Sequence, residues 1–124
     1  RFLQDKWKSF FNNKKIEFFA RSLFLQGILV DQNLSYKIQD KKSKVLLNKW
    51  YYYINFNKLD MVDECLNFAK MKKIKNLVVG MNSLKQIDQL VYHKLNKNKK
   101  LSHFKSKYEK LIDPRLWNNN AKKS

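Results

Sequence analysis

Hydrophobic positions recur at three- and four-residue steps in four segments of the chain, and this spacing is typical of amphipathic helices. The segments cover residues 2–11, residues 37–56, the stretch that follows Asp60, and residues 83–95. In residues 37–56 the recurring positions are Ile38, Val45, Leu46, Lys49, Trp50, Tyr53 and Ile54. Asp60 stands where an N-cap is expected, since its carboxylate can accept hydrogen bonds from the first amides of a helix. The pattern therefore predicts four helices.

Two short apolar runs interrupt the helical segments and predict strands that are buried on both faces. The runs are residues 16–20 and residues 74–80, and Gly27 allows a sharp turn after the first of them. The order strand, helices, strand, helix predicts parallel strands joined by a right-handed crossover. Because two short strands alone leave open edges and bury little area, we expect an α/β fold that other polypeptide must complete.

Composition favours one folded domain rather than a disordered or membrane-spanning chain. Of the 124 residues 44% are hydrophobic, which is enough for one core. No uninterrupted apolar stretch approaches the roughly 20 residues of a membrane span. The single cysteine, Cys65, lies among apolar residues of a predicted helix, so we expect a core position and a reducing compartment. The expectation is a soluble cytoplasmic protein without membrane contact.

The formal net charge of +17 allows a second interpretation, in which a basic surface binds phosphates. Lysines are spread along every segment together with many Asn, Ile, Phe and Tyr residues, and a bias in codon composition would produce this pattern. The densest basic stretch, residues 93–110, could still contact an anionic partner, with Phe104 and Tyr108 as stacking groups. The alternative function is therefore a small basic helical module that binds nucleic acid or another acidic partner.

The titratable residues predict neither a catalytic group nor a metal site in this chain. The carboxylates are few and scattered, so no pair is placed for general acid and base catalysis. Cys65 has no recognisable His partner that would activate it as a nucleophile. His93 and His103 lack further ligands at the spacing that metal sites use, and we expect both to be exposed to solvent.

Three stretches occur in the order "IEFFARSLFLQGIL", "IKNLVVGMNSLKQIDQL" and "DPRLW". In order and spacing they resemble the C-terminal part of the aldo-keto reductases, especially bacterial members whose seventh barrel strand reads Ala-Arg-Ser and continues Phe-Leu-Gln-Gly. The resemblance implies the C-terminal segment of an eight-stranded (β/α) TIM barrel, with two parallel strands and several helices. It covers residues 1–117, and residues 118–124 form a basic polar tail. The missing partner would be the N-terminal half of the barrel, in the same parent chain or as a complementary polypeptide.

The resemblance also implies where NADP, or NAD, would bind at the carboxyl ends of the barrel strands. The cofactor-binding positions are Arg21, Ser22, Phe24, Gln26 and Gly27 after the seventh strand, and Gly80, Met81, Asn82, Ser83, Gln86 and Gln89 after the eighth. Leu23 replaces a usual proline, Gln86 an arginine that contacts the 2′-phosphate, and Leu90 an asparagine near the adenine. Lys85 could substitute for that arginine. Without the resemblance, Ser83 and Gln86 form a capping box that needs no ligand, and Arg21 and Ser22 are ordinary surface residues.

The function implied by the family is hydride transfer between a nicotinamide and a small carbonyl or alcohol substrate. The family's catalytic Asp, Tyr, Lys and His lie in the N-terminal half of its barrel, and no tyrosine of this chain matches the catalytic one. We therefore expect the cofactor-binding part of an NAD(P)H-dependent aldo-keto reductase-like oxidoreductase, inactive by itself. A third interpretation is a degenerate barrel fragment that serves as an interaction piece.

Overall fold

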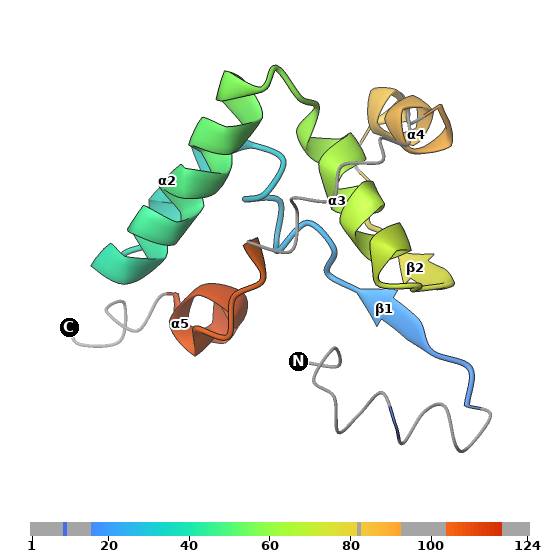
Figure 1. The fold of residues 1–124 in the computed structure, drawn as a ribbon, viewed down its shortest axis with the longest axis horizontal. Coiled ribbons are helices and arrows are strands. Elements are labelled where there is room, and N and C mark those ends of the chain that lie inside the picture. The colour runs from blue at the N-terminus through green and yellow to red at the C-terminus, as the bar shows by residue number, and fades with distance from the viewer. Residues whose placement is uncertain (1–8, 10–15, 82, 93–103, 118–124) are drawn as a thin grey trace.

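The structure, a computed structural model, describes Ser9 and residues 16–81, 83–92 and 104–117 (Figure 1). Its elements in chain order are strand β1 (Phe19–Arg21), 3-10 helix η1 (Gln32–Lys37), helices α2 (Lys41–Phe56) and α3 (Met61–Met71), strand β2 (Asn76–Val78), helices α4 (Leu84–Val91) and α5 (Glu109–Ile112), and 3-10 helix η3 (Pro114–Leu116). Helices α2 and α3 diverge from the short connection between them, and both strands lie at the far end of α3 (Figure 1). The predicted helix at residues 2–11, all but Ser9, and the tail at residues 118–124 fall outside the described residues.

The two strands pair in parallel, as the order of elements predicts. Phe19 pairs with Asn76, and Arg21 pairs with Val78. Both strands are shorter than predicted, and residues 16–18 precede β1 without strand pairing. The expectation that both faces are buried is wrong, because Phe19 is 56% and Val78 54% exposed. Paired residues of a parallel sheet share a face, as do residues two apart on one strand. Phe19 and Val78 therefore lie on the same face, and that face, as described, lacks a covering layer.

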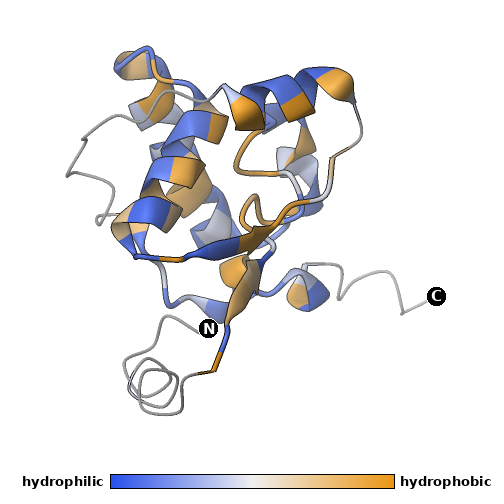
Figure 2. Cartoon of the chain, turned by 90° about the vertical axis from the view of Figure 1, so that its right-hand side faces the viewer, coloured by the Kyte–Doolittle hydropathy of each residue, from blue (hydrophilic) through white to orange (hydrophobic). Residues whose placement is uncertain are grey.

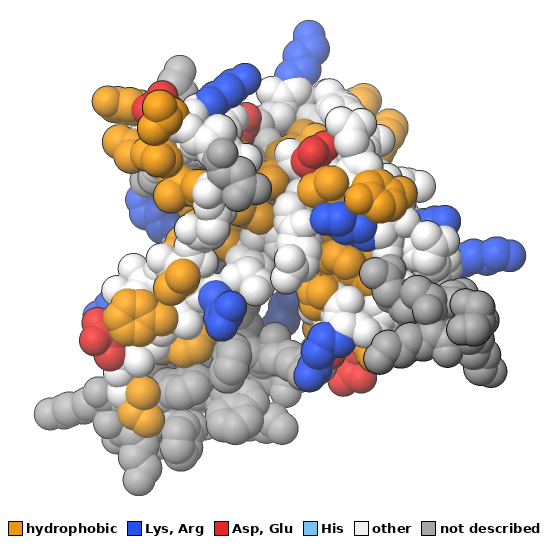
Figure 3. All heavy atoms as spheres, turned by 180° about the vertical axis from the view of Figure 1, so that it is seen from behind, with side chains coloured by type: hydrophobic (Ala, Val, Ile, Leu, Met, Phe, Trp, Pro, Cys, Tyr) orange, Lys and Arg blue, Asp and Glu red, His pale blue; other side chains and the backbone are white. Residues whose placement is uncertain are grey.

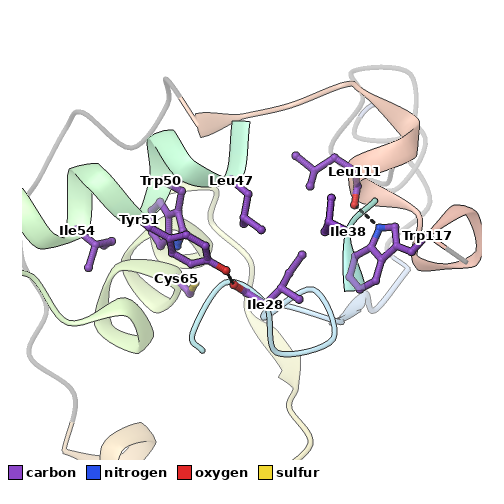
Figure 4. Packing of buried hydrophobic residues seen from close by; sticks show 9 residues of the cluster. All are labelled: Ile28, Ile38, Leu47, Trp50, Tyr51, Ile54, Cys65, Leu111 and Trp117. Atoms are coloured by element: carbon purple, nitrogen blue, oxygen red, sulfur yellow. Dashed lines mark hydrogen bonds between the residues drawn. The ribbon is translucent and has the colours of Figure 1, made fainter. Parts of the chain in front are cut away.

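Nine residues from the turn after β1, the end of η1, the helices α2 and α3, and the C-terminal segment form the hydrophobic core (Figure 4). They are Ile28, Ile38, Leu47, Trp50, Tyr51, Ile54, Cys65, Leu111 and Trp117. Two hydrogen bonds join members of this core, since the Tyr51 hydroxyl donates to the Ile28 carbonyl and the Trp117 indole N–H donates to the Leu111 carbonyl. Burial raises the pKa of Tyr51 to about 12, so its hydroxyl remains a donor at neutral pH. The core therefore joins the turn after β1 and the C-terminal residues to α2.

Helix α2 is confirmed, but it begins at Lys41 and not at residue 37. The Asp40 carboxylate caps it by accepting from the Ser43 amide at 2.9 Å, and residue 37 is instead the last residue of η1. The buried face also differs from the predicted one: its members are Ser43, Leu47, Trp50, Tyr51 and Ile54, and Val45 is 55% exposed. Hydrogen bonds from Trp50 and Tyr51 to the carbonyls of Leu29 and Ile28 select this face. Apolar and polar residues alternate along the helices (Figure 2).

Helix α3 agrees with the sequence in its cap and in part of its buried face. One oxygen of Asp60, Oδ1, accepts from the amides of Val62 and Asp63, which confirms the predicted N-cap. Cys65 is 5% exposed, so its predicted core position is confirmed. Leu66 and Ala69 are buried as the spacing predicts, whereas the burial of Glu64 and Asn67 is not predicted by it.

Helix α4 begins after Ser83 as predicted, but its aligned apolar residues are not covered. Leu84 is 80%, Ile87 39% and Val91 65% exposed, and Figure 3 shows apolar side chains on the surface of this helix. The helix packs against α3. Its predicted continuation to residue 95 falls outside the described residues, as do His93 and His103. In the part of the chain that the structure describes, no helix is both long and apolar enough to cross a membrane.

Candidate functional site

The parallel register brings the two predicted cofactor-binding turns to the same edge of the sheet. Arg21, the last residue of β1, pairs with Val78, the last residue of β2. The chain leaves both strands in the same direction because the strands are parallel. Ser22 and Gly80 therefore begin turns that start side by side. Such an edge, at the carboxyl ends of parallel strands, is where ligands bind in α/β sheets.

The first turn has an unusual backbone. Four of its six residues have positive φ: Ser22 (62°), Leu25 (47°), Gln26 (55°) and Gly27 (86°). A side chain in this region costs about 1–2 kcal/mol, and such strain is concentrated at functional sites in proteins. Two backbone hydrogen bonds hold the turn: the Leu25 amide donates to Ser22 at 3.0 Å, and the Gly27 amide donates to Phe24 at 2.9 Å.

The side chains of the first turn divide into exposed and packed ones. Arg21, Ser22 and Gln26 are exposed at the edge of the sheet. Phe24 is half-buried and packs against the hydrophobic core, and its carbonyl accepts from the Gly27 amide. The fold itself explains Gly27, because a Cβ there would lie 2.9 Å from Leu34 Cδ1 at a φ of +86°. No ligand is needed to account for that glycine.

The second turn is open around its glycine. Gly80 is exposed, its φ is not positive, and a Cβ built on it would meet nothing within 4 Å. Neither backbone conformation nor packing of the described residues therefore requires glycine at this position. Met81 beside it is 42% exposed, and Asn82 lies outside the described residues. The open space leaves the backbone of this turn accessible to a ligand.

Ser83 caps α4, as the capping-box interpretation predicts. Its Oγ accepts a hydrogen bond from the Gln86 amide at 3.3 Å. The first amides of a helix have no partner within the helix and carry a partial positive charge, so they favour anions. Lys85 and Gln86 are exposed on this first turn, and Gln89 is half-buried one turn later. The local chemistry suits a phosphate and also works without one.

A cavity of about 940 Å³ lies between β1, the helices α2 and α3, and residues 104–112. Its walls are mostly apolar, and Arg21 and Ser22 are the predicted site residues that line it. Its most unusual lining residue is Glu64, which is 1% exposed and which the sequence reasoning missed. A signal was present, since Glu64 comes immediately before Cys65 and four residues before Phe68, both on the apolar side of α3.

Burial raises the pKa values of two side chains in the cavity wall, Glu64 and Cys65. It raises the pKa of the Glu64 carboxyl, and a hydrogen bond from the Asn67 amide at 3.2 Å partly opposes this effect. It also raises the pKa of Cys65 to about 12, helped by the charges of Glu64 and Asp60. Cys65 is therefore a neutral thiol near pH 7 and not an activated nucleophile.

Searches against models of known protein families, the curated proteins and the solved structures each found no match to this chain. Among the described residues, no group of three His, Cys, Asp or Glu side chains could hold a metal ion. The candidate site consequently rests on the strand register and on the two turns that leave the sheet together.

Proposed function

We propose that this chain is the cofactor-binding part of an NAD(P)H-dependent oxidoreductase of the aldo-keto reductase type. The observation that carries the proposal is the register of β1 and β2, in which Arg21 lies opposite Val78. That register places the turn beginning at Ser22 next to the turn beginning at Gly80, as a dinucleotide that spans two neighbouring strands requires.

The two turns differ in what they offer a dinucleotide. The first offers the exposed side chains of Arg21, Ser22 and Gln26 on a backbone of fixed, strained shape. The guanidinium of Arg21 is planar and can stack on a ring or pair with a phosphate. The second offers the open backbone at Gly80 and the first amides of α4, with Lys85 beside them. This donor set fits an anionic phosphate end.

The exposed face of the sheet supports the view that further strands complete the fold. Phe19 and Val78 are more than half exposed and point to the same side, whereas their neighbours Ala20 and Leu77 are half-buried toward the helices. Purely parallel sheets are found with both faces covered. We therefore propose that the N-terminal half of a barrel, from the same parent chain or from a complementary polypeptide, covers this face.

The bound nicotinamide would supply the hydride, and the residues of this chain would hold the cofactor in place. The strained turn at residues 22–27 and the capped start of α4 are suited to this positioning role because their backbones are fixed before a ligand arrives. The proton and the small carbonyl or alcohol substrate would be handled by the completing half. The proposal thus assigns binding, and no catalytic step, to the described residues.

The test is a titration of the intact gene product that contains these residues with NADPH and with NADH, followed by nicotinamide fluorescence. Gly80→Leu is expected to weaken binding at least about tenfold, because the added side chain fills the space through which the ligand reaches the backbone. Lys75→Leu, at the amino end of β2, is the control and should leave the affinity unchanged. Equal affinity of Gly80→Leu and the unchanged protein would remove this turn from the site, and failure of both dinucleotides to bind would overturn the proposal.

The basic-module alternative gains no support from the packing of its two aromatic residues. The Phe104 ring lies 5.3 Å from that of Trp50 and 4.8 Å from that of Tyr53, centroid to centroid. Tyr108 is half-buried, with Lys42 Nζ 4.6 Å above its ring. Both rings are thus engaged in contacts within the fold and do not form a stacking platform for bases.

A further inference from the structure

The cavity on the helix-facing side of β1 contains a polar group without a partner. Glu64 is 1% exposed, and its Oε1 accepts from the Asn67 amide at 3.2 Å. Its second oxygen, Oε2, is buried and has no hydrogen-bond partner. A buried acceptor without a donor is unfavourable, and such groups are rare in folded proteins. Because Glu64 lines the cavity, a donor placed in the cavity would satisfy it.

The rest of the cavity has the character of a site for an apolar molecule. The volume of about 940 Å³ is in the range of ligand pockets. Leucines of the turn after β1, the indole of Trp50 and the ring of Phe68 form much of its wall. Such a wall gains free energy when an apolar chain displaces water from it.

Exposed lysines mark where the cavity meets solvent. Lys42 and Lys49 on α2 and Lys105 and Lys107 on the C-terminal segment line it, and all four are exposed. Among the described lining residues Glu64 is the single acidic one, and it is buried. The mouth of the cavity is therefore positively charged, whereas its interior is apolar and contains one hydrogen-bond acceptor. Charge complementarity favours an anionic group at the mouth.

We propose that this cavity binds an elongated amphiphile with an anionic head and a terminal hydroxyl, the chemistry of an ω-hydroxy fatty acid. The carboxylate head lies among the lysines at the mouth, the hydrocarbon chain lies along the apolar wall, and the hydroxyl donates to Glu64 Oε2. The cavity shares Arg21 and Ser22 with the proposed dinucleotide site, but this proposal rests on Glu64 and the lysines and does not depend on dinucleotide binding.

The test compares three probes by isothermal titration calorimetry on the intact gene product that contains these residues, below the concentrations at which the probes form micelles. The probes are ω-hydroxydodecanoate, dodecanoate and ω-methoxydodecanoate, and the methyl ether has the same head but cannot donate a hydrogen bond. We expect the hydroxy acid to bind roughly tenfold more tightly than either of the others, because a factor of ten corresponds to the free energy that one satisfied hydrogen bond contributes. Equal dissociation constants for the three probes, or no binding, would overturn the proposal.

Two variants test which residues bind the hydroxyl end and the carboxylate end of the ligand. Glu64→Leu should abolish the preference for the hydroxyl, whereas Lys105→Ala should weaken all three probes by a similar factor. Lys44→Ala on α2 is the matched lysine control, because Lys44 is exposed and does not line the cavity, and it should leave all three dissociation constants unchanged. A preference for the hydroxyl that survives Glu64→Leu contradicts the assignment. If Glu64→Leu does not fold, the comparison between the hydroxy and methoxy probes decides the question without a variant.

Discussion

Replacing Gly27 with alanine should destabilise the fold, whereas the same change at Gly80 should not. Gly27 has a φ of +86°, and an added Cβ would lie 2.9 Å from Leu34 Cδ1. Gly80 has neither feature, since its φ is not positive and nothing lies within 4 Å of an added Cβ. The two substitutions are chemically identical, so the difference between them isolates the geometry of the turn after β1.

The magnitude follows from three contributions. Holding alanine in the left-handed region costs about 1–2 kcal/mol relative to glycine. Moving the end of the Leu34 side chain costs about 1 kcal/mol, at the low end for overpacking because the contact is with a flexible terminus. Reduced freedom of the unfolded chain returns about 0.4–1 kcal/mol. We therefore expect Gly27→Ala to lower the free energy of unfolding by roughly 2 kcal/mol, and Gly80→Ala to leave it unchanged or raise it by up to about 1 kcal/mol.

Urea unfolding followed by circular dichroism and tryptophan fluorescence measures both free energies. For a chain of this length, the Gly27→Ala change corresponds to a fall in Tm of roughly 6–10 °C. The reasoning is refuted if Gly27→Ala is as stable as the unchanged protein, or if Gly80→Ala loses as much stability. Either result would mean that the turn does not hold Gly27 in the left-handed conformation against Leu34.

Three further outcomes are expected. Lys58→Gly should raise the free energy of unfolding by about 1 kcal/mol in a thermal melt, because Lys58 has a φ of 52° just after α2; Lys58→Ala should give no such gain. Tyr51→Phe should lower it by about 1–3 kcal/mol in urea, because the buried Ile28 carbonyl loses its donor; an unchanged midpoint would contradict this. Cys65, 5% exposed with a pKa of about 12, should react with Ellman's reagent at pH 8 only as fast as the protein unfolds. Rapid labelling of the folded protein would show that the thiol is accessible.

Local patterns were sufficient for the elements whose formation depends on neighbouring residues. The capping role of Asp60 follows from its carboxylate and the helical pattern after it, and the structure confirms it. Ser83 and the start of α4 follow in the same way. A cap is a contact over two or three residues, so sequence neighbours decide it.

The buried face of α2 could not be predicted in the same way. The spacing of residues 37–56 predicts a helix but permits more than one apolar stripe, and Val45 was placed on the wrong one. Trp50 and Tyr51 settle the orientation by hydrogen bonding to Leu29 and Ile28, more than twenty residues earlier. Contacts across such a separation leave no periodic signal in the sequence.

In the candidate sites, too, some features follow from the sequence and others are decided only by the tertiary structure. The sequence alone places Arg21, Ser22 and Gly80 after two apolar runs, and the order of elements predicts that the strands are parallel. Only the tertiary structure decides that the runs pair in register, so that both turns leave one edge. The position of Glu64 beside Cys65 and Phe68 was only a weak signal, since an acidic residue in a first helical turn normally faces solvent, where it meets the positive end of the helix. Its burial depends on what packs over α3, which the chain determines only when it is folded.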